Sequence, residues 1–205
     1  LGILRRRPMV DFPVDVHPWS WRKDRYSPRQ LAALWRRQLA LPAVSHDYPV
    51  ALYIHVPFCT HTCGFCRCFR LQLSGGRGLL ERYVGFLCDQ IDFFAPVCSG
   101  MPIRDYSVGG GTPSILPPPL RRRLLARLHE RFDVRRDNPL TTFEMSLPTT
   151  HDETLDLLAE FKVPRVSIGV QTLRPEVRRR SSMFKIEPRH LEDRVRAVMS
   201  RGLNC

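Results

Sequence analysis

Beyond residue 49, the chain alternates between short apolar runs and longer segments whose apolar residues recur every three or four positions. The short runs predict β-strands over residues 50–56, 103–108, 141–146 and 165–170. The periodic segments predict helices, with apolar positions spaced over residues 80–94, 120–132, 155–161 and 191–199. Because no hairpin signal joins successive strands, the pattern predicts an α/β fold in which helices pack outside a parallel sheet.

Two local signals mark the ends of these helices. Thr150 and Glu153 have the spacing of a capping box, which predicts that Thr150 caps the third helix. Gly202 follows the last periodic residue, at the C′ position where many helices close with glycine.

The first 48 residues differ in composition from the rest. Residues 1–48 are rich in Pro and Arg and predict an irregular arm with one short amphipathic helix over 27–39. Residues 49–205 form the α/β domain in this interpretation. Because the last residues end where a helix would lead into another strand, we expect that this domain is truncated at the C-terminus.

The charge and hydropathy of the chain indicate which kinds of partner to expect. The 205-residue chain has a formal net charge of +12, carried mostly by Arg in scattered runs. This charge can steer anionic partners or simply solvate helix faces, but it is a poor footprint for nucleic acid, which we do not expect to bind. No apolar stretch approaches the ~18 residues that span a bilayer, and no signal peptide is evident, so we expect a cytoplasmic protein without a membrane partner.

Four of the seven cysteines lie close together on the loop that leaves the first strand: Cys59, Cys63, Cys66 and Cys68. Such clustering points to metal or redox chemistry rather than to a disulfide scaffold. Cys59, Cys63 and Cys66 have C-x3-C-x2-C spacing, so one short loop can present three thiolates to three corners of a [4Fe–4S] cluster and leave the fourth iron open. A zinc site, closed by Cys68 or a nearby histidine, is the alternative.

Further candidates stand at the C-terminal ends of the predicted strands, where α/β folds build their sites. The glycines at 109–111 would let backbone N–H groups approach an anion closely, or would serve only a tight turn. Glu144 could accept hydrogen bonds from hydroxyl groups, or could be a solvated charge at a strand end. Gln171 offers both a donor and an acceptor to a polar cofactor.

The segment Tyr-Ile-His-Val-Pro-Phe-Cys at 53–59, with the C-x3-C-x2-C-x-C cysteines, resembles the radical S-adenosylmethionine (SAM) superfamily. Within it, the chain most resembles the oxygen-independent coproporphyrinogen III oxidase family, because of Tyr-x-His-x-Pro-Phe and the extra Cys68. Three more motifs occur in the family's order: Gly-Gly-Gly-Thr-Pro-Ser at 109–114, Phe-Glu-Met-Ser-Leu-Pro at 143–148 and Arg-Val-Ser-Ile-Gly-Val-Gln at 165–171.

The resemblance implies a partial (β/α)6 radical SAM barrel and an oxidoreductase similar to coproporphyrinogen dehydrogenase of porphyrin biosynthesis. Such an enzyme uses a [4Fe–4S] cluster to cleave SAM to a 5′-deoxyadenosyl radical, which abstracts hydrogen from substrate. The implied partners are a porphyrinogen-like anionic tetrapyrrole and an electron donor such as flavodoxin or ferredoxin. Positions that match contacts to one or two SAM molecules in the family are Tyr53, Phe65, Gly110, Gly111, Thr112, Glu144 and Gln171, and Cys59, Cys63 and Cys66 match the cluster ligands.

The chain departs from the family at two positions. Met183 stands where the family has an Arg that contacts the second SAM, although arginines lie close by at 178–180. Arg67 stands where the oxidase often has Gly. Three other functions therefore stay open: a radical SAM methyltransferase of the same branch, a non-catalytic heme-binding or heme-trafficking relative, and a zinc-stabilised nucleic-acid-binding module.

Overall fold

The computed structural model describes residues 27–39, 50–73, 77–99, 103–134 and 138–205. Helix α1 (Pro28–Leu39) lies where the pattern predicts it. It begins with a reciprocal capping box, in which Gln30 N–H donates to Ser27 Oγ (3.3 Å) and Ser27 N–H donates to Gln30 Oε1 (2.8 Å). The rest of the predicted arm lies outside the described residues, so the division of the chain after residue 48 stays a prediction.

Four parallel strands form the central sheet. In order across the sheet they are β1 (Val50–Val56), β4 (Ile103–Gly110), β5 (Thr142–Ser146) and β6 (Arg165–Gly169). Each strand pairs in parallel with the next of these along the chain. The predicted parallel α/β fold is therefore confirmed. Because the order never reverses, the winding is that of a barrel segment rather than of a doubly wound sheet, which has a switch point.

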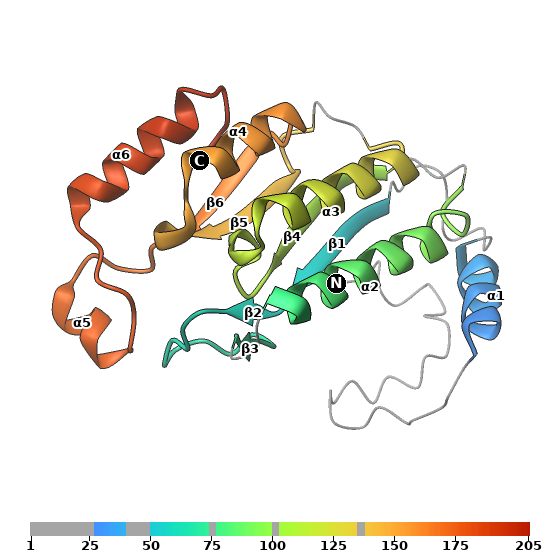
Figure 1. The fold of residues 1–205 in the computed structure, drawn as a ribbon, viewed down its shortest axis with the longest axis horizontal. Coiled ribbons are helices and arrows are strands. Elements are labelled where there is room, and N and C mark those ends of the chain that lie inside the picture. The colour runs from blue at the N-terminus through green and yellow to red at the C-terminus, as the bar shows by residue number, and fades with distance from the viewer. Residues whose placement is uncertain (1–26, 40–49, 74–76, 100–102, 135–137) are drawn as a thin grey trace, which may run out of the picture.

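Helices follow the strands and pack against one face of the sheet (Figure 1). They are α2 (Arg77–Phe94), α3 (Pro118–Arg131), α4 (Asp152–Glu160) and α6 (Pro188–Met199). Adjacent helices contact each other in the order α2, α3, α4, α6. The core lies between the helices and the sheet, where each strand buries at least one apolar side chain, among them Val56, Val108, Phe143 and Val166. The other face is open at the edge strands, where Tyr53, Arg165 and Ser167 are exposed.

Of the two predictions for helix ends, one is wrong and one is confirmed. The capping box at Thr150 is wrong: His151 is the N-cap residue, and the buried Thr150 hydroxyl donates instead to Ser146 O (2.9 Å). The intervening 3-10 turn η2 (Leu147–Thr149) directs that hydroxyl back towards the strand. At the other end of the chain, Gly202 is confirmed as a C′ glycine, with φ of +72°.

The structure adds several short elements that are too brief to have a periodic signature. They are β2 (Phe58–Cys59), β3 (Leu71–Gln72), the 3-10 turn η1 (Pro113–Ile115) and α5 (Pro175–Arg180). Each lies in a connection that leaves the C-terminal end of a sheet strand. These connections build the candidate site.

Candidate functional site

The open face of the sheet is polar, because polar side chains alternate with the core residues along each strand. Tyr53 pairs in register with Ser107, Ser107 with Thr142, and Thr142 with Arg165, so these residues form one row across all four strands. Arg165 Nε donates to Thr142 Oγ1 at 2.8 Å. A row of hydroxyl and guanidinium groups is suited to binding a polar molecule rather than to packing against a second apolar layer.

Glu144 is the carboxylate of this face. It is half-buried, and its Oε2 accepts a hydrogen bond from Gly110 N–H at 3.2 Å. Partial burial is the main cause that raises the pKa of the Tyr53 hydroxyl, and the negative charges of Glu144 and Cys68 raise it further. The Tyr53 hydroxyl therefore lies within electrostatic reach of the Glu144 carboxylate. Two of the predicted cofactor-binding residues, Tyr53 and Glu144, are thus brought together.

The glycine run fits between three neighbouring groups. A Cβ atom on Gly109 would lie 2.7 Å from the Glu144 carboxylate, and one on Gly111 would lie 2.6 Å from Phe58 O. Gly110 has φ of +112°, a conformation that favours glycine, and its Cβ would lie 2.5 Å from the His55 ring. A backbone contact therefore accounts for Gly111 and the positive φ for Gly110, whereas at Gly109 the neighbour is the end of the Glu144 side chain, which can move.

Backbone donors next to the glycine run are used within the chain. Gly111 N–H donates to Val56 O (2.8 Å), and Thr112 N–H donates to Phe58 O (2.8 Å). The Thr112 hydroxyl lies 3.6 Å from Cys59 Sγ. The end of β4 is thereby fastened to the residues that lead into the cysteine loop.

The cysteine loop, residues 60–70, is closed at its base. The two residues before it (β2) pair in parallel with the two residues after it (β3). Leu73 N–H also donates to Cys59 O at 2.8 Å. The chain therefore enters and leaves the loop at the same place, and Cys59 is held at the entrance.

A distant segment holds the outer part of this loop (Figure 1). Gly64 N–H donates to Ser181 O at 2.8 Å, and the His61 ring hydrogen bonds to Ser182 O. The ring centroids of His61 and Phe184 are 4.8 Å apart. The loops that follow the first and fourth strands of the sheet therefore meet above its C-terminal edge.

The donor set fits an iron–sulfur cluster. Cys59, Cys63 and Cys66 are free, partly buried thiols. Burial, and then Cys66 and Cys59, raise the pKa of the Cys63 thiol, while Arg70 and Arg178 act to lower it, so the thiols and two cations lie within electrostatic reach. In the described ranges, no three His, Cys, Asp or Glu side chains are arranged to hold a single metal ion. A cluster needs a wider arrangement, because each thiolate binds a different iron.

The other residues of the loop are more exposed. Phe65 is 45% exposed and Phe69 is 72% exposed. Cys68 is also exposed, and charge on Cys66, followed by burial and a hydrogen bond with Cys66, raises the pKa of Cys68. The predicted SAM-contacting Phe65 thus has free surface to offer a ligand.

Arg178 is the buried cation of the site and is 6% exposed. Its Nη1 donates to Val170 O (2.7 Å) and Thr172 O (2.6 Å), and its Nε donates to Phe184 O (2.6 Å). These bonds fold the chain after β6 back on itself. Arg178 therefore supports the segment that contacts the cysteine loop.

Gln171 lies within the turn that Arg178 holds. Its φ of +66° places a non-glycine residue in the left-handed region, a strain of order 1–3 kcal/mol that is typically found at functional sites. Its side chain is exposed, and Met183, at the position of the missing Arg, is half-buried. Arg179 and Arg180 are exposed and stand outside the Arg178 hydrogen-bond set.

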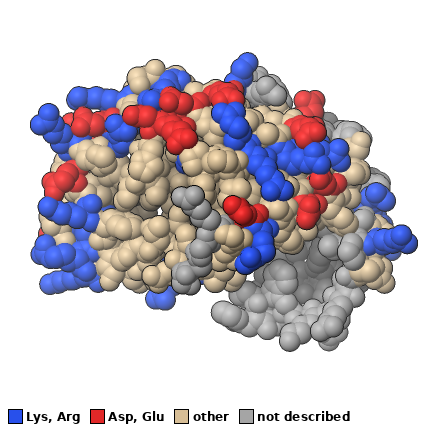
Figure 2. All heavy atoms as spheres, in the orientation of Figure 1, with Lys and Arg blue, Asp and Glu red and all other residues tan. Residues whose placement is uncertain are grey.

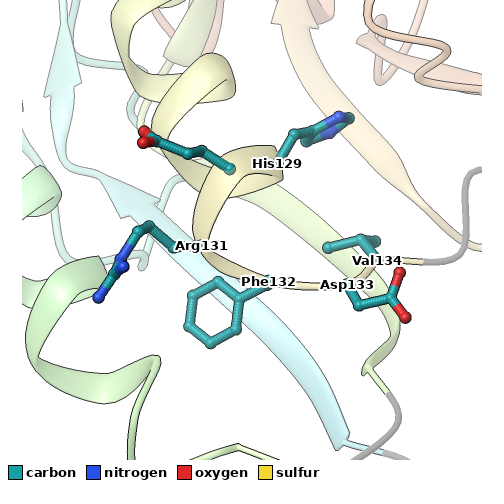
Figure 3. A pocket seen from close by; sticks show the side chains of 6 residues that line it. His129, Arg131, Phe132, Asp133 and Val134 are labelled. Atoms are coloured by element: carbon teal, nitrogen blue, oxygen red, sulfur yellow. The ribbon is translucent and has the colours of Figure 1, made fainter.

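Two cavities lie away from the cysteine loop. One, of about 270 Å³, is lined by residues 129–134 at the C-terminal end of α3 (Figure 3). The other, of about 530 Å³, lies between β1 and α2, and Tyr53 and His55 form part of its wall. Phe132 lines both cavities, so they are neighbours, and only the second extends along β1 to Tyr53 and His55.

Sequence reasoning missed the residues that support the loop rather than bind a ligand. His55 Nε2 forms a hydrogen bond with Phe69 O (3.0 Å), and the Tyr83 hydroxyl donates to His55 O (2.8 Å). His55 is a polar residue within the otherwise apolar run of residues 50–56, and this break in the pattern could have marked it as a supporting residue. The contacts of His61 and Arg178 had no such signal, because their partners are defined only by the fold.

The sequence model of the Radical SAM superfamily matches residues 53–205, which is more than half of the chain. The chain belongs to the radical SAM superfamily. Within it, the chain resembles the coproporphyrinogen oxidase branch, as the motifs predicted. It is 34% identical over 160 residues to the oxygen-independent coproporphyrinogen III oxidase of Cereibacter sphaeroides, a match that covers 75% of this chain and 34% of that protein.

Two further comparisons add to this relationship. The chain is 32% identical over 124 residues to the heme chaperone HemW of Lactococcus lactis, covering 60% of this chain and 31% of that protein. The chain thus spans about a third of the length of these curated relatives. The structure of coproporphyrinogen III oxidase (HemN) from Escherichia coli, a radical SAM enzyme, matches with a TM-score of 0.73 at 24% identity, over 87% of this chain and 39% of that one. This likeness confirms the predicted partial radical SAM barrel.

No helix in the described ranges is both long and apolar enough to cross a membrane.

Proposed function

We propose that this chain is part of a radical SAM oxidoreductase resembling oxygen-independent coproporphyrinogen III oxidase, with a [4Fe–4S] cluster on Cys59, Cys63 and Cys66. When bound, the cluster supplies the electron that cleaves SAM to a 5′-deoxyadenosyl radical, which abstracts hydrogen from a porphyrinogen-like substrate. The observation that carries the proposal is the anchored loop with Cys59 at its entrance and Cys63 and Cys66 within it, which together bring three free thiols to the C-terminal edge of a radical SAM sheet.

The residues of the polar face are assigned to SAM. Glu144 would accept hydrogen bonds from ribose hydroxyl groups, and Tyr53, which is 60% exposed beside it, would contact the ligand. Gly110, Gly111 and Thr112 would contribute mainly by close backbone approach, since their N–H groups already donate within the chain. The remaining SAM contacts, for one or two molecules, are assigned to Phe65 and Gln171.

The proposal also includes a substrate class, an electron donor and a cellular location. An anionic tetrapyrrole suits a chain with a net charge of +12 and an open face that carries Arg165. A separate electron donor and a cytoplasmic location follow from a cluster that must be reduced and kept from oxygen.

The test is anaerobic reconstitution with iron and sulfide, followed by EPR of the reduced protein with and without SAM. We expect about four irons per chain and a signal that changes on adding SAM, because the fourth iron is open. Cys63→Ala should lose the signal, whereas Cys205→Ala, at an exposed cysteine outside the loop, should keep it. Zinc in place of iron, or a spectrum indifferent to SAM, would contradict the proposal.

Heme trafficking without catalysis is the second candidate, favoured by the 32% identity to a heme chaperone. Product analysis separates the two functions. The oxidoreductase releases 5′-deoxyadenosine and methionine and converts porphyrinogen, whereas a trafficking protein gives a heme difference spectrum and leaves porphyrinogen unchanged.

A further inference from the structure

Most arginines on the helical layer are neutralised by carboxylates. Arg127 Nη2 lies 2.6 Å from Asp92, and Arg201 Nε lies 2.6 Å from Asp156. Other pairs join Arg122 to Glu160, Arg131 to Asp92 and Arg194 to Asp152. Figure 2 shows this layer as interleaved blue and red along the top of the molecule. These charges therefore contribute little net potential to the surface.

The arginines around α5 lack such partners. Residues 174–189 contain six basic side chains and two carboxylates. Lys185 is paired with Glu187 at 2.6 Å, but the exposed arginines here form no ion pair with another residue that the structure describes. We name the α5 basic surface by its exposed members, Arg174, Arg179, Arg180, Lys185 and Arg189. It lies at the lower left of Figure 2, over α5.

This surface adjoins the cysteine loop through the backbone. Ser181 and Ser182 lie in sequence between Arg180 and Lys185, and their carbonyl oxygens accept hydrogen bonds from Gly64 and His61 of the loop. Basic charge without an ion pair among the described residues therefore lies beside the proposed cluster, and also at exposed positions of α1, Arg29, Arg36 and Arg37.

The shape of the surface favours a protein over a small molecule. Small molecules bind in concave sites, but the side chains of the α5 basic surface are exposed on a short helix and its flanks. Neither cavity of about 270 or 530 Å³ includes a residue of this surface. An exposed cluster in which basic side chains outnumber carboxylates instead orients and accelerates the approach of an acidic protein.

We propose that the α5 basic surface docks an acidic protein that delivers single electrons to the cysteine loop. This inference rests on the proposed function, because only a bound cluster requires the electron. In each transfer the reduced flavin or iron–sulfur centre of the carrier is oxidised by one electron, and the cluster is reduced by one. The interface directs the carrier towards the loop, with Arg179 and Arg180 placed next to the residues that contact it.

The test measures binding of a bacterial flavodoxin, an acidic flavoprotein, to the full chain by calorimetry, before and after iron–sulfur loading. The variant R174E/R179E/R180E is compared with R29E/R36E/R37E, which reverses the same number of charges at exposed positions of α1, at the other end of the molecule in Figure 1. Loss of three exposed ion pairs corresponds to about a tenfold loss of affinity for the α5 variant. Circular dichroism checks that both variants are folded.

Weaker binding in the α5 variant alone, with affinity that falls as salt rises, supports the docking surface. Equal losses in both variants, or no loss in either, overturn it, because net charge or another face would then be responsible. Tighter binding of duplex DNA than of flavodoxin by the α5 surface also overturns it. Since docking is measured on the cluster-free chain as well, failure of the docking surface is distinguished from failure of cluster binding, which the iron content and EPR spectrum report.

Discussion

Replacing Gly111 by Ala should separate the cysteine loop from the sheet that supports it. A Cβ atom at this position would lie 2.6 Å from Phe58 O and 2.7 Å from Pro57 C, and both contacts are with backbone atoms. Neither atom can yield by a change of rotamer, so the chain that leads into Cys59 must move. Overpacking of this kind costs about 1–3 kcal/mol, and a backbone clash belongs near the upper end of that range.

The displacement should also be visible at the loop. Gly111 N–H donates to Val56 O (2.8 Å), and moving either partner weakens the link between β4 and the loop entrance. We expect urea denaturation to give a free energy of unfolding lower by about 2–3 kcal/mol. We also expect fewer irons per chain after reconstitution.

Gly85→Ala provides the matched control. Gly85 lies within α2, and the nearest atom to its added Cβ is a side-chain nitrogen of Arg123 at 3.9 Å. Ala there should stabilise the helix by about 0.5–1 kcal/mol and leave iron loading unchanged. If Gly111→Ala unfolds at the same urea concentration as the unsubstituted chain and binds the same amount of iron, the packing argument for the glycine run is refuted.

Three other substitutions test the supports of the site and the helical layer. Arg178→Met removes three hydrogen bonds to carbonyl oxygens and should speed hydrogen exchange at Gly64 N–H at least tenfold, while Arg179→Met, an exposed neighbour, should not. Arg121→Ala removes a buried guanidinium that donates to Ser114 O (3.3 Å). This substitution should lower the free energy of unfolding by about 2–4 kcal/mol in thermal or urea denaturation. Arg121→Met keeps the apolar volume of the side chain and should lower it less. Asp92→Asn tests pH dependence, because the hydrogen bond from Arg127 lowers the pKa of Asp92. The stability from this carboxylate is present above its unfolded pKa of about 3.9 and is lost as pH falls through the lower folded value. Melting temperatures should therefore differ between the Asp92→Asn variant and the unsubstituted chain at pH 6 and converge below pH 3; a constant difference would contradict the shift.

The fold was largely readable from periodicity, because the buried strands and amphipathic helices carry long signals. Strand β1 begins and ends where the apolar run does, and Gly202 closes the last helix as expected. The capping box at Thr150 failed because a 3-10 turn, too short to have a period, offers its hydroxyl a nearer acceptor in Ser146.

The sequence predicts a set of ligands for the site, which stays a prediction, but it does not predict the residues that support the loop. Cysteine spacing predicts the chemistry of the loop locally, since the thiol donors lie within a few residues of one another. The hydrogen bond from His61 to Ser182 joins residues 121 positions apart, and no local pattern encodes it. The same holds for Arg178, which reads as one of several surface arginines until its burial and its three carbonyl partners are known.

The closed base of the cysteine loop and its contact with Ser181 link cofactor loading to folding. Because the loop ends are already joined, the folded chain does not have to supply the loop-closure entropy when a cluster binds. A ligand that binds only this folded loop stabilises the native state by about 2.7 kcal/mol at one hundred times its dissociation constant. The loop also touches the segment after β6, so part of that stabilisation reaches the far edge of the sheet. If a cluster binds here, its loading would slow the opening of β1 and of the segment after β6 together.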